Sequence, residues 1–288
     1  MITFNNDSLS VIGDEWVYYK IYTGESFIDK LLSNILVASK QLYKEGIIDK
    51  WFFIRYYDPR FHIRLRFHLT NSKKIQYVIE LMNVSLSEYL IEGLIDNVQI
   101  DSYIKENERY GGKVGCALSE YIFFADSVMM CEFSSLLGQN KEEERWLFAL
   151  INMDNLMNDF SLSIETRLIF LGNLIDYFHV DFLKNKYLSK QFDAKFRDHL
   201  REIKMFLDND KSNIFEYLVN IRRKMYNQII LEILNGIKDE TIHKSVFDLL
   251  SSYMHMSCNR LFRTEHRRNE FVLYNILLRF YKYRLYSK

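Results

Sequence analysis

Apolar and polar residues alternate along much of the first third of the chain, a pattern typical of β-strands. Residues 16–22 are aromatic and β-branched and stop at Thr23-Gly24, which predicts a strand that ends in a turn. Residues 51–57 and 61–69 predict two more strands, and Asp58-Pro59-Arg60 between them has the composition of a hairpin turn.

Apolar residues three and four positions apart indicate helices in most of the remaining chain. Residues 26–43 and 73–92 predict helices, and residues 97–103 predict one further strand. From residue 114 onward the pattern is helical almost throughout, with turn signals near Gly138, Asp208–Asn213 and Gly236. The expected fold class is therefore α+β, with a small, mostly antiparallel sheet in the N-terminal third packed with a predominantly helical C-terminal part.

No linker rich in Pro, Gly or Ser separates the mixed segment, residues 1–113, from the helical segment, residues 114–288. We therefore expect one domain over residues 1–288, with two domains as the alternative. A chain of 288 residues that is 48% apolar and has a single proline can bury a full core, which excludes disordered and collagenous classes.

The charge and the cysteine content of the chain limit the classes of binding partner and the cellular compartment that we expect. The 38 Lys and Arg residues balance 38 Asp and Glu residues, so no global charge favours nucleic acid or an anionic membrane. Cys116, Cys131 and Cys258 are widely spaced, which indicates neither a disulfide framework nor a zinc site. The sequence shows no signal peptide and no run of 18 uncharged apolar residues, so we expect a cytoplasmic protein without membrane insertion. Because the charge is balanced, we also expect no direct nucleic-acid binding.

Two arginines share one face of the predicted strand 61–69. Arg64 and Arg66, with His62 and His68, alternate with apolar residues that face the other side. Positions i and i+2 of a strand lie about 6.6 Å apart, so the two guanidinium groups could hold different oxygens of an anion such as a dicarboxylate. The alternative is an ordinary strand with a solvated polar face.

Arg109 and His255 are two further candidates. Arg109 precedes Tyr110-Gly111-Gly112, where the glycines permit backbone angles that other residues resist; the alternative is a solvated turn. His255 lies on a predicted helix with Ser251, Cys258 and Asn259 as neighbours one turn away, a setting that suits acid or base chemistry but equally a structural histidine. Motifs of dinucleotide, P-loop, serine-hydrolase and zincin sites are absent from the sequence.

Three segments together resemble the glutamate-elimination domain of class I lanthipeptide dehydratases, also called the thiopeptide-type bacteriocin biosynthesis domain. The matching stretches are WFFIRYYDPRFHIRLRF at 51–67, ERYGG at 108–112 followed by FFADS at 123–127, and HMSCNRL at 255–261. They occur in the family's order, and the resemblance spans nearly the whole chain.

The resemblance implies a lyase that removes glutamate from glutamylated Ser or Thr of a ribosomally made precursor peptide, leaving dehydroalanine or dehydrobutyrine. It implies no metal and no redox cofactor. By motif matching, the implied catalytic residues are Arg64, Arg66, Arg109 and His255. The implied substrate-binding residues are His62, Tyr110 and Asn259. We expect the three arginines and His255 to converge in one cleft.

Full-length dehydratases of this type also contain a large domain that uses glutamyl-tRNA to glutamylate the peptide, and 288 residues cannot contain both parts. The resemblance therefore implies a free-standing elimination protein that works with a separate glutamylation subunit; the assembly state, including a homodimer, is left open. One alternative is a thiopeptide pyridine synthase of the same fold, which joins two dehydroalanines in a formal [4+2] cycloaddition. The other is a non-catalytic scaffold subunit that binds the peptide.

Overall fold

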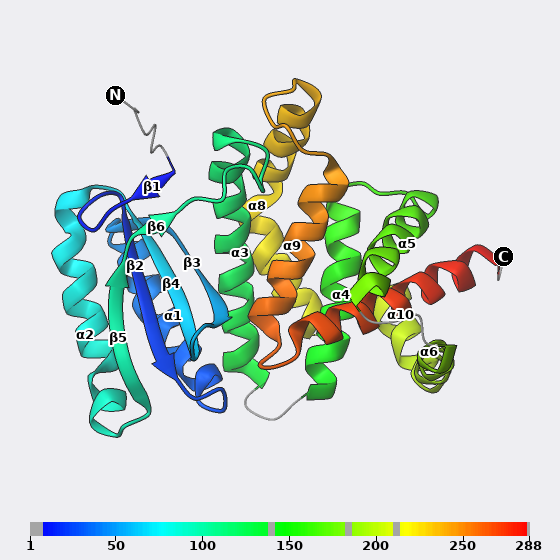
Figure 1. The fold of residues 1–288 in the computed structure, drawn as a ribbon, viewed down its shortest axis with the longest axis horizontal. Coiled ribbons are helices and arrows are strands. Elements are labelled where there is room, and N and C mark those ends of the chain that lie inside the picture. The colour runs from blue at the N-terminus through cyan, green and yellow to red at the C-terminus, as the bar shows by residue number, and fades with distance from the viewer. Residues whose placement is uncertain (1–7, 138–141, 182–185, 210–213, 287–288) are drawn as a thin grey trace. The chain divides into compact units, whose positions relative to one another are not determined.

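The computed structural model describes residues 8–137, 142–181, 186–209 and 214–286 (Figure 1). The first third contains both strands and helices, and the described residues from 113 onward are mainly helical, which confirms the predicted α+β class. The elements in chain order are β1 (Leu9–Ser10), β2 (Trp16–Thr23), α1 (Ile28–Lys44), β3 (Ile48–Tyr57), β4 (Phe61–Leu69), η1 (Ser72–Lys74), α2 (Ile75–Ile91), β5 (Ile95–Asp101), β6 (Tyr103–Ile104), α3 (Lys113–Leu137), α4 (Glu142–Asp159), α5 (Ile164–Asp181), α6 (Lys186–Asp198), α7 (Leu200–Lys204), η2 (Met205–Asn209), α8 (Ile214–Lys238), α9 (Val246–Leu261) and α10 (His266–Tyr286).

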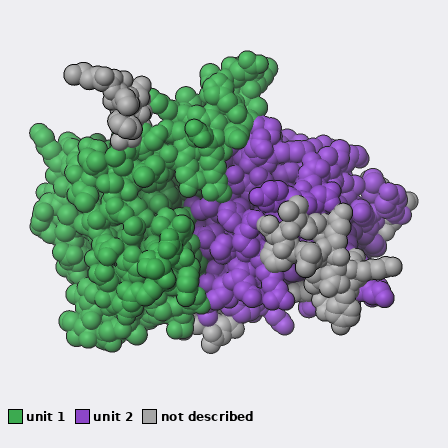
Figure 2. Space-filling model, in the orientation of Figure 1, with its two compact units in different colours: residues 1–139, 222–244 green, residues 140–221, 245–288 purple. Residues whose placement is uncertain are grey.

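The chain forms two compact units, which Figure 2 shows in different colours. Unit 1 comprises residues 1–139 and 222–244, and unit 2 comprises residues 140–221 and 245–288. The sheet, α1 to α3 and most of α8 belong to unit 1, and the other helices belong to unit 2. The expectation of one domain over the whole chain stays a prediction.

A four-stranded antiparallel sheet in the order β3-β4-β2-β5 forms the centre of unit 1. The strands β3 and β4 form the predicted hairpin around Asp58-Pro59-Arg60. The apolar side of β4 is completely buried at Ile63, Leu65 and Phe67, and α1 and α2 lie along the sheet (Figure 1). The packing of this face fixes the strand register, since a slip of one residue would put charged side chains in place of these apolar ones.

Helix α3 packs along the edge strand β3, where the Ser127 hydroxyl accepts a hydrogen bond of 3.2 Å from the Phe53 backbone N–H. Covering an edge in this way prevents pairing with another chain. Among the described helices, residues 113–136 of α3 form the one stretch long and apolar enough to cross a membrane, and 72% of its apolar window is buried inside the protein. Such burial is typical of a core helix.

The structure corrects one of the predicted elements. Residues 97–103 do not form one strand: β5 ends at Asp101, and Tyr103 belongs to β6, which pairs with the short strand β1 in a separate two-stranded sheet. The turn signal near Gly236 is confirmed, because α8 ends at Lys238 and a turn follows it. A Cβ atom at Gly236 would lie 2.8 Å from the Ile242 side chain, so this glycine makes room for the segment that folds back on α8. Of the other turn signals, Gly138 and residues 210–213 lie outside the described residues.

In unit 2, helices α9 and α10 follow each other closely and pack together. Helix α9 begins with a capping box in which the Ser245 hydroxyl accepts from the Asp248 backbone N–H, and the Asp248 carboxylate accepts from that of Ser245. Met254 of α9 and Tyr274 of α10 are completely buried. This packing sets the orientation of the histidine next to Met254.

Candidate active site

Arg66 is a buried cation on the polar face of β4. Its residue is 7% exposed, and its guanidinium carbon lies 4.4 Å from the Tyr18 ring centroid, 4.7 Å from that of Tyr103 and 5.3 Å from that of Phe52. Burial lowers the pKa of the Arg66 guanidinium, but arginine stays protonated in proteins at neutral pH. Aromatic faces therefore surround a positive charge.

Arg66 lacks a close anion within the described part of the chain. Its Nε is buried without a hydrogen-bond partner, and no described carboxylate lies within ion-pair distance of it. A buried charge without an ion-pair partner is costly, so such groups are normally paired or bind a ligand. The site is therefore suited to an anion that comes from outside the protein.

Arg64 lies next to Arg66 on the same face and is held by its neighbours. Its guanidinium stacks 3.3 Å from the Tyr56 ring centroid, and its Nε donates a 3.3 Å hydrogen bond to Nε2 of His62. The other ring nitrogen of His62, Nδ1, lies 2.9 Å from the Arg60 carbonyl oxygen, which fits a neutral imidazole that donates from Nδ1. Burial and the nearby Arg64 charge lower the pKa of His62, consistent with the neutral form.

His62 itself has no exposed surface. The geometry thus gives it contact with Arg64 rather than a surface that a ligand can reach. His62 is therefore suited to positioning Arg64, and its predicted substrate contact stays a prediction.

Arg109 lies in the turn between β6 and α3, with a side chain that is 36% exposed. Its Nη1 donates a 3.0 Å hydrogen bond to the Glu106 carboxylate. Glu106 also lies near enough to Arg66 to favour the charged form of that guanidinium, and so raises its pKa against the effect of burial. Within unit 1, Glu106 thus pairs with Arg109 and acts electrostatically on Arg66.

Tyr110 is 3% exposed, and its ring packs on Phe123 at 5.1 Å between centroids. Its predicted substrate contact stays a prediction. Gly111 and Gly112, with φ of 80° and 106°, make the turn that follows. The Gly111 carbonyl accepts a 2.9 Å hydrogen bond from the His243 backbone N–H, so the turn is docked on the segment after α8.

Replacing Gly111 with alanine is expected to lower the free energy of unfolding by about 3 kcal/mol, because a side chain meets both an unfavourable φ and a close neighbour. A Cβ atom there would lie 2.7 Å from the Ile242 side chain and 3.1 Å from the His243 nitrogen. Gly93→Ala is the control: φ is 68° but nothing lies within 4 Å, so about 1 kcal/mol is expected. Urea unfolding of both variants measures the difference, and equal losses would contradict the close-approach argument.

His255 of α9 forms a hydrogen-bonded pair with a carboxylate that the sequence did not reveal. Its Nδ1 lies 2.9 Å from Oε2 of Glu270 on α10, and the Glu270 side chain is only 3% exposed. Because a carboxylate only accepts, Nδ1 carries a hydrogen, and Nε2 is therefore the ring nitrogen that can exchange a proton with a substrate. The His255 side chain is 24% exposed, so the ring retains access to solvent.

Two more groups hold Glu270. The Tyr274 hydroxyl donates a 2.7 Å hydrogen bond to Oε1, and Nη1 of Arg267 lies 3.4 Å from Oε2 and 3.5 Å from Nδ1 of His255. Burial and the adjacent Glu270 charge raise the pKa of Tyr274 well above its usual value, so the phenol remains a donor. The histidine is thus oriented by a buried carboxylate that is itself fixed.

The predicted neighbours of His255 on its own helix play a smaller part. Cys258 and Asn259 are buried, and the Ser251 hydroxyl donates to the Asp248 backbone carbonyl. The substrate contact predicted for Asn259 stays a prediction. Glu270 was missed because it lies on the next helix, and helical spacing along α9 gives no information on it.

The three arginines belong to unit 1, and His255 belongs to unit 2. Their convergence in one cleft stays a prediction. Among the described residues, His, Cys, Asp and Glu side chains form no group of three or more that could hold a metal ion.

Fold and site together define an α+β protein with a cationic, aromatic-lined sheet face and a carboxylate-oriented histidine. The chain belongs to the lantibiotic biosynthesis dehydratase C-terminal family, whose model matches residues 16–281. Subtilin biosynthesis protein SpaB of Bacillus subtilis is 26% identical over 296 residues, covering 98% of this chain and 26% of SpaB. The chain thus spans about a quarter of the length of the curated relatives it matches.

Solved structures share the fold. The tRNA-dependent lantibiotic dehydratase MibB from Microbispora sp. 107891 matches with a TM-score of 0.70 and 17% identity, over 92% of this chain and 28% of MibB. The pyridine synthase TbtD from thiomuracin biosynthesis matches with a TM-score of 0.64 and 11% identity, over 95% of this chain and 99% of TbtD. At these identities the likeness concerns the fold alone.

Proposed function

We propose that this chain is a lyase that eliminates glutamate from glutamylated Ser or Thr residues of a precursor peptide, producing dehydroalanine or dehydrobutyrine. The observation that carries the proposal is the buried guanidinium of Arg66, without an ion-pair partner among the described residues and next to Arg64 on one strand face. A glutamyl ester carries a free carboxylate, and its elimination releases a second one. Both suit a pair of fixed cations.

In the proposed reaction a base removes the Cα proton of the glutamylated residue, the Cα–Cβ double bond forms, and the Cβ–O bond breaks to release glutamate. His255 supplies the proton transfer through Nε2, while Glu270 holds Nδ1–H and stabilises the imidazolium once the proton has been taken up. Arg66 and Arg64 bind the glutamyl group and stabilise the negative charge that develops as it leaves. Arg109 supports them as a third cation linked through Glu106.

The mass of a glutamylated precursor peptide incubated with the purified protein tests the proposal. Loss of glutamic acid with formation of the alkene is the expected result. Release of the leader with ring formation would instead indicate the pyridine synthase, and an unchanged peptide would indicate the scaffold. We favour elimination because a cycloaddition of two dehydroalanines has no glutamyl carboxylate for the arginines to bind.

Glu270→Gln is expected to lower kcat of elimination about 10-fold, because glutamine still accepts the Nδ1–H bond but loses the negative charge that strengthens it. Steady-state kinetics on the glutamylated peptide measure the change. Glu265→Gln is the matched control, since Glu265 is exposed and pairs with Arg268 at the surface. Equal kcat values for folded Glu270→Gln and the wild type would contradict the orienting role of Glu270.

The partners follow from the proposed reaction. The glutamylated precursor peptide is the substrate, and a glutamyl-tRNA-dependent activity must supply it. Because both the tRNA and the newly made peptide are found in the cytoplasm, we propose that the elimination takes place there.

A further inference from the structure

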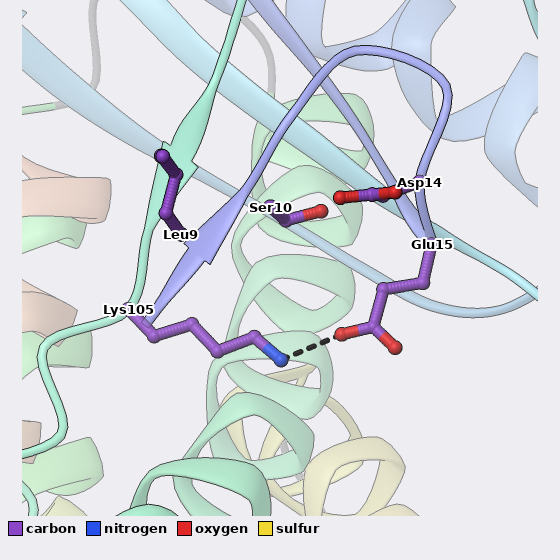
Figure 3. A pocket seen from close by; sticks show the side chains of 5 residues that line it. All are labelled: Leu9, Ser10, Asp14, Glu15 and Lys105. Carbon is purple, nitrogen blue, oxygen red and sulfur yellow. Dashed lines mark hydrogen bonds and ion pairs between the residues drawn. The ribbon is translucent and has the colours of Figure 1, made fainter. Parts of the chain in front are cut away.

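A cavity of about 240 Å³ lies beside the two-stranded sheet of unit 1 (Figure 3). Strand β1, the loop that follows it and the residue after β6 form its walls. The lining residues are Leu9, Ser10, Asp14, Glu15 and Lys105. The reaction mechanism above uses none of them.

Ser10 is the feature of this cavity that points to a ligand. The residue is 6% exposed, and its hydroxyl oxygen is buried without a hydrogen-bond partner among the residues that the structure describes. Figure 3 shows the oxygen directed across the cavity toward Asp14. A buried hydroxyl without a partner costs free energy, whereas a ligand that hydrogen bonds to it recovers that cost on binding.

Each charged group of the cavity already has at least one partner within the protein. Lys105 Nζ lies 2.6 Å from one Glu15 oxygen, and the other Glu15 oxygen lies 3.7 Å from Nε2 of His68. One Asp14 oxygen accepts a 3.0 Å hydrogen bond from the Val11 backbone N–H. A charged ligand would disturb the Glu15–Lys105 pair. A neutral N–H donor would instead meet two possible acceptors, the Ser10 hydroxyl oxygen and the remaining Asp14 oxygen.

The cavity adjoins the proposed active site. Ser10 pairs with Tyr103 across β1 and β6, so their side chains share one face of this small sheet. The Tyr103 ring stacks on Arg66 at 4.7 Å. A peptide held with its reacting residue at Arg66 would therefore place a flanking residue near the cavity.

We propose that this cavity is a subsite that binds the backbone N–H of one peptide unit flanking the reacting residue, with Ser10 as the acceptor. The inference rests on the proposed function for the identity of the peptide. An extended peptide offers such a donor at every residue, and main-chain hydrogen bonds are a general source of affinity for peptides of varied sequence.

Ser10→Ala tests the subsite through peptide binding, measured by fluorescence anisotropy with a labelled glutamylated precursor peptide. We expect Kd to rise about 3- to 10-fold, as for loss of one neutral hydrogen bond. Thermal stability should not fall, because the hydroxyl has no hydrogen-bond partner in the described part of the chain. Ser8→Ala is the control: the Ser8 hydroxyl accepts a 2.9 Å hydrogen bond from the Asn107 side chain, so its loss should lower Tm and leave Kd unchanged.

Peptides N-methylated at one backbone position at a time locate the donor. One position should weaken binding to the wild type but not to Ser10→Ala, as a double-mutant cycle requires of two groups in contact. An unchanged Kd for Ser10→Ala, or the absence of any such position, would overturn the subsite even if glutamate is eliminated. Coupling between Ser10 and one peptide N–H would support the subsite even if the bound peptide is not turned over. The experiment therefore distinguishes failure of the subsite from failure of the proposed elimination.

Discussion

His255→Ala is expected to lower the rate of glutamate elimination by about 10²- to 10⁴-fold, the usual contribution of a positioned proton-transfer group. In the presence of the glutamylating activity, glutamylated peptide should then accumulate, which mass spectrometry detects. The protein should remain folded, because Glu270 keeps its hydrogen bond from the Tyr274 hydroxyl and the nearby Arg267. Thermal unfolding close to that of the wild type is the check on this point.

Further variants distinguish a loss of proton transfer from a loss of side-chain packing. One is a control at another histidine, and two replace His255 by other side chains. His199→Ala, at a half-exposed histidine paired with Glu202, should retain wild-type activity. His255→Asn and His255→Phe should each be as inactive as His255→Ala if proton transfer is what is lost. Normal dehydration by a folded His255→Ala protein would refute the catalytic assignment.

Arg66→Lys is expected to lower kcat/KM about 100-fold although it preserves the charge. Lysine has neither the planar fork that binds a carboxylate through two N–H groups nor the flat face that stacks on the rings of Tyr18 and Tyr103. Stability should change by only about 1 kcal/mol, because the described residues give Arg66 no ion pair to lose. Kinetics on the glutamylated peptide and urea unfolding measure the two effects.

A substrate analogue tests whether Arg66 recognises the free carboxylate of the glutamyl group. On a peptide whose ester lacks the free carboxylate of glutamate, the ratio of wild-type to Arg66→Lys rates should shrink, because the group that Arg66 binds is missing. Arg60→Lys is the matched control, since Arg60 lies in the same hairpin but its side chain is 63% exposed. An undiminished ratio on the analogue would show that Arg66 does not recognise the glutamyl carboxylate.

The sequence pattern predicted correctly those parts of the sheet that depend on neighbouring residues alone. The alternation over residues 61–69 gave the exact bounds of β4, and Asp58-Pro59-Arg60 marked its hairpin with β3. The pattern of residues 97–103 failed because strand propensity does not show that a chain leaves one sheet for another at Ser102. The turn signal near Gly236 agrees with the end of α8 at Lys238, but the reason for a glycine there, the close approach of Ile242, lies outside the helix.

The sequence by itself determined that Arg64 and Arg66 share a strand face and that His255 is helical, since both follow from backbone periodicity within a few residues. Family membership also rests on the sequence, through three ordered motifs and the match over residues 16–281. Only the tertiary structure decided that the Tyr103 ring stacks on Arg66, that Glu270 orients His255, and that Ser10 faces a cavity without a hydrogen-bond partner among the described residues. These contacts join segments that periodicity treats independently, because they depend on how elements pack rather than on which elements form.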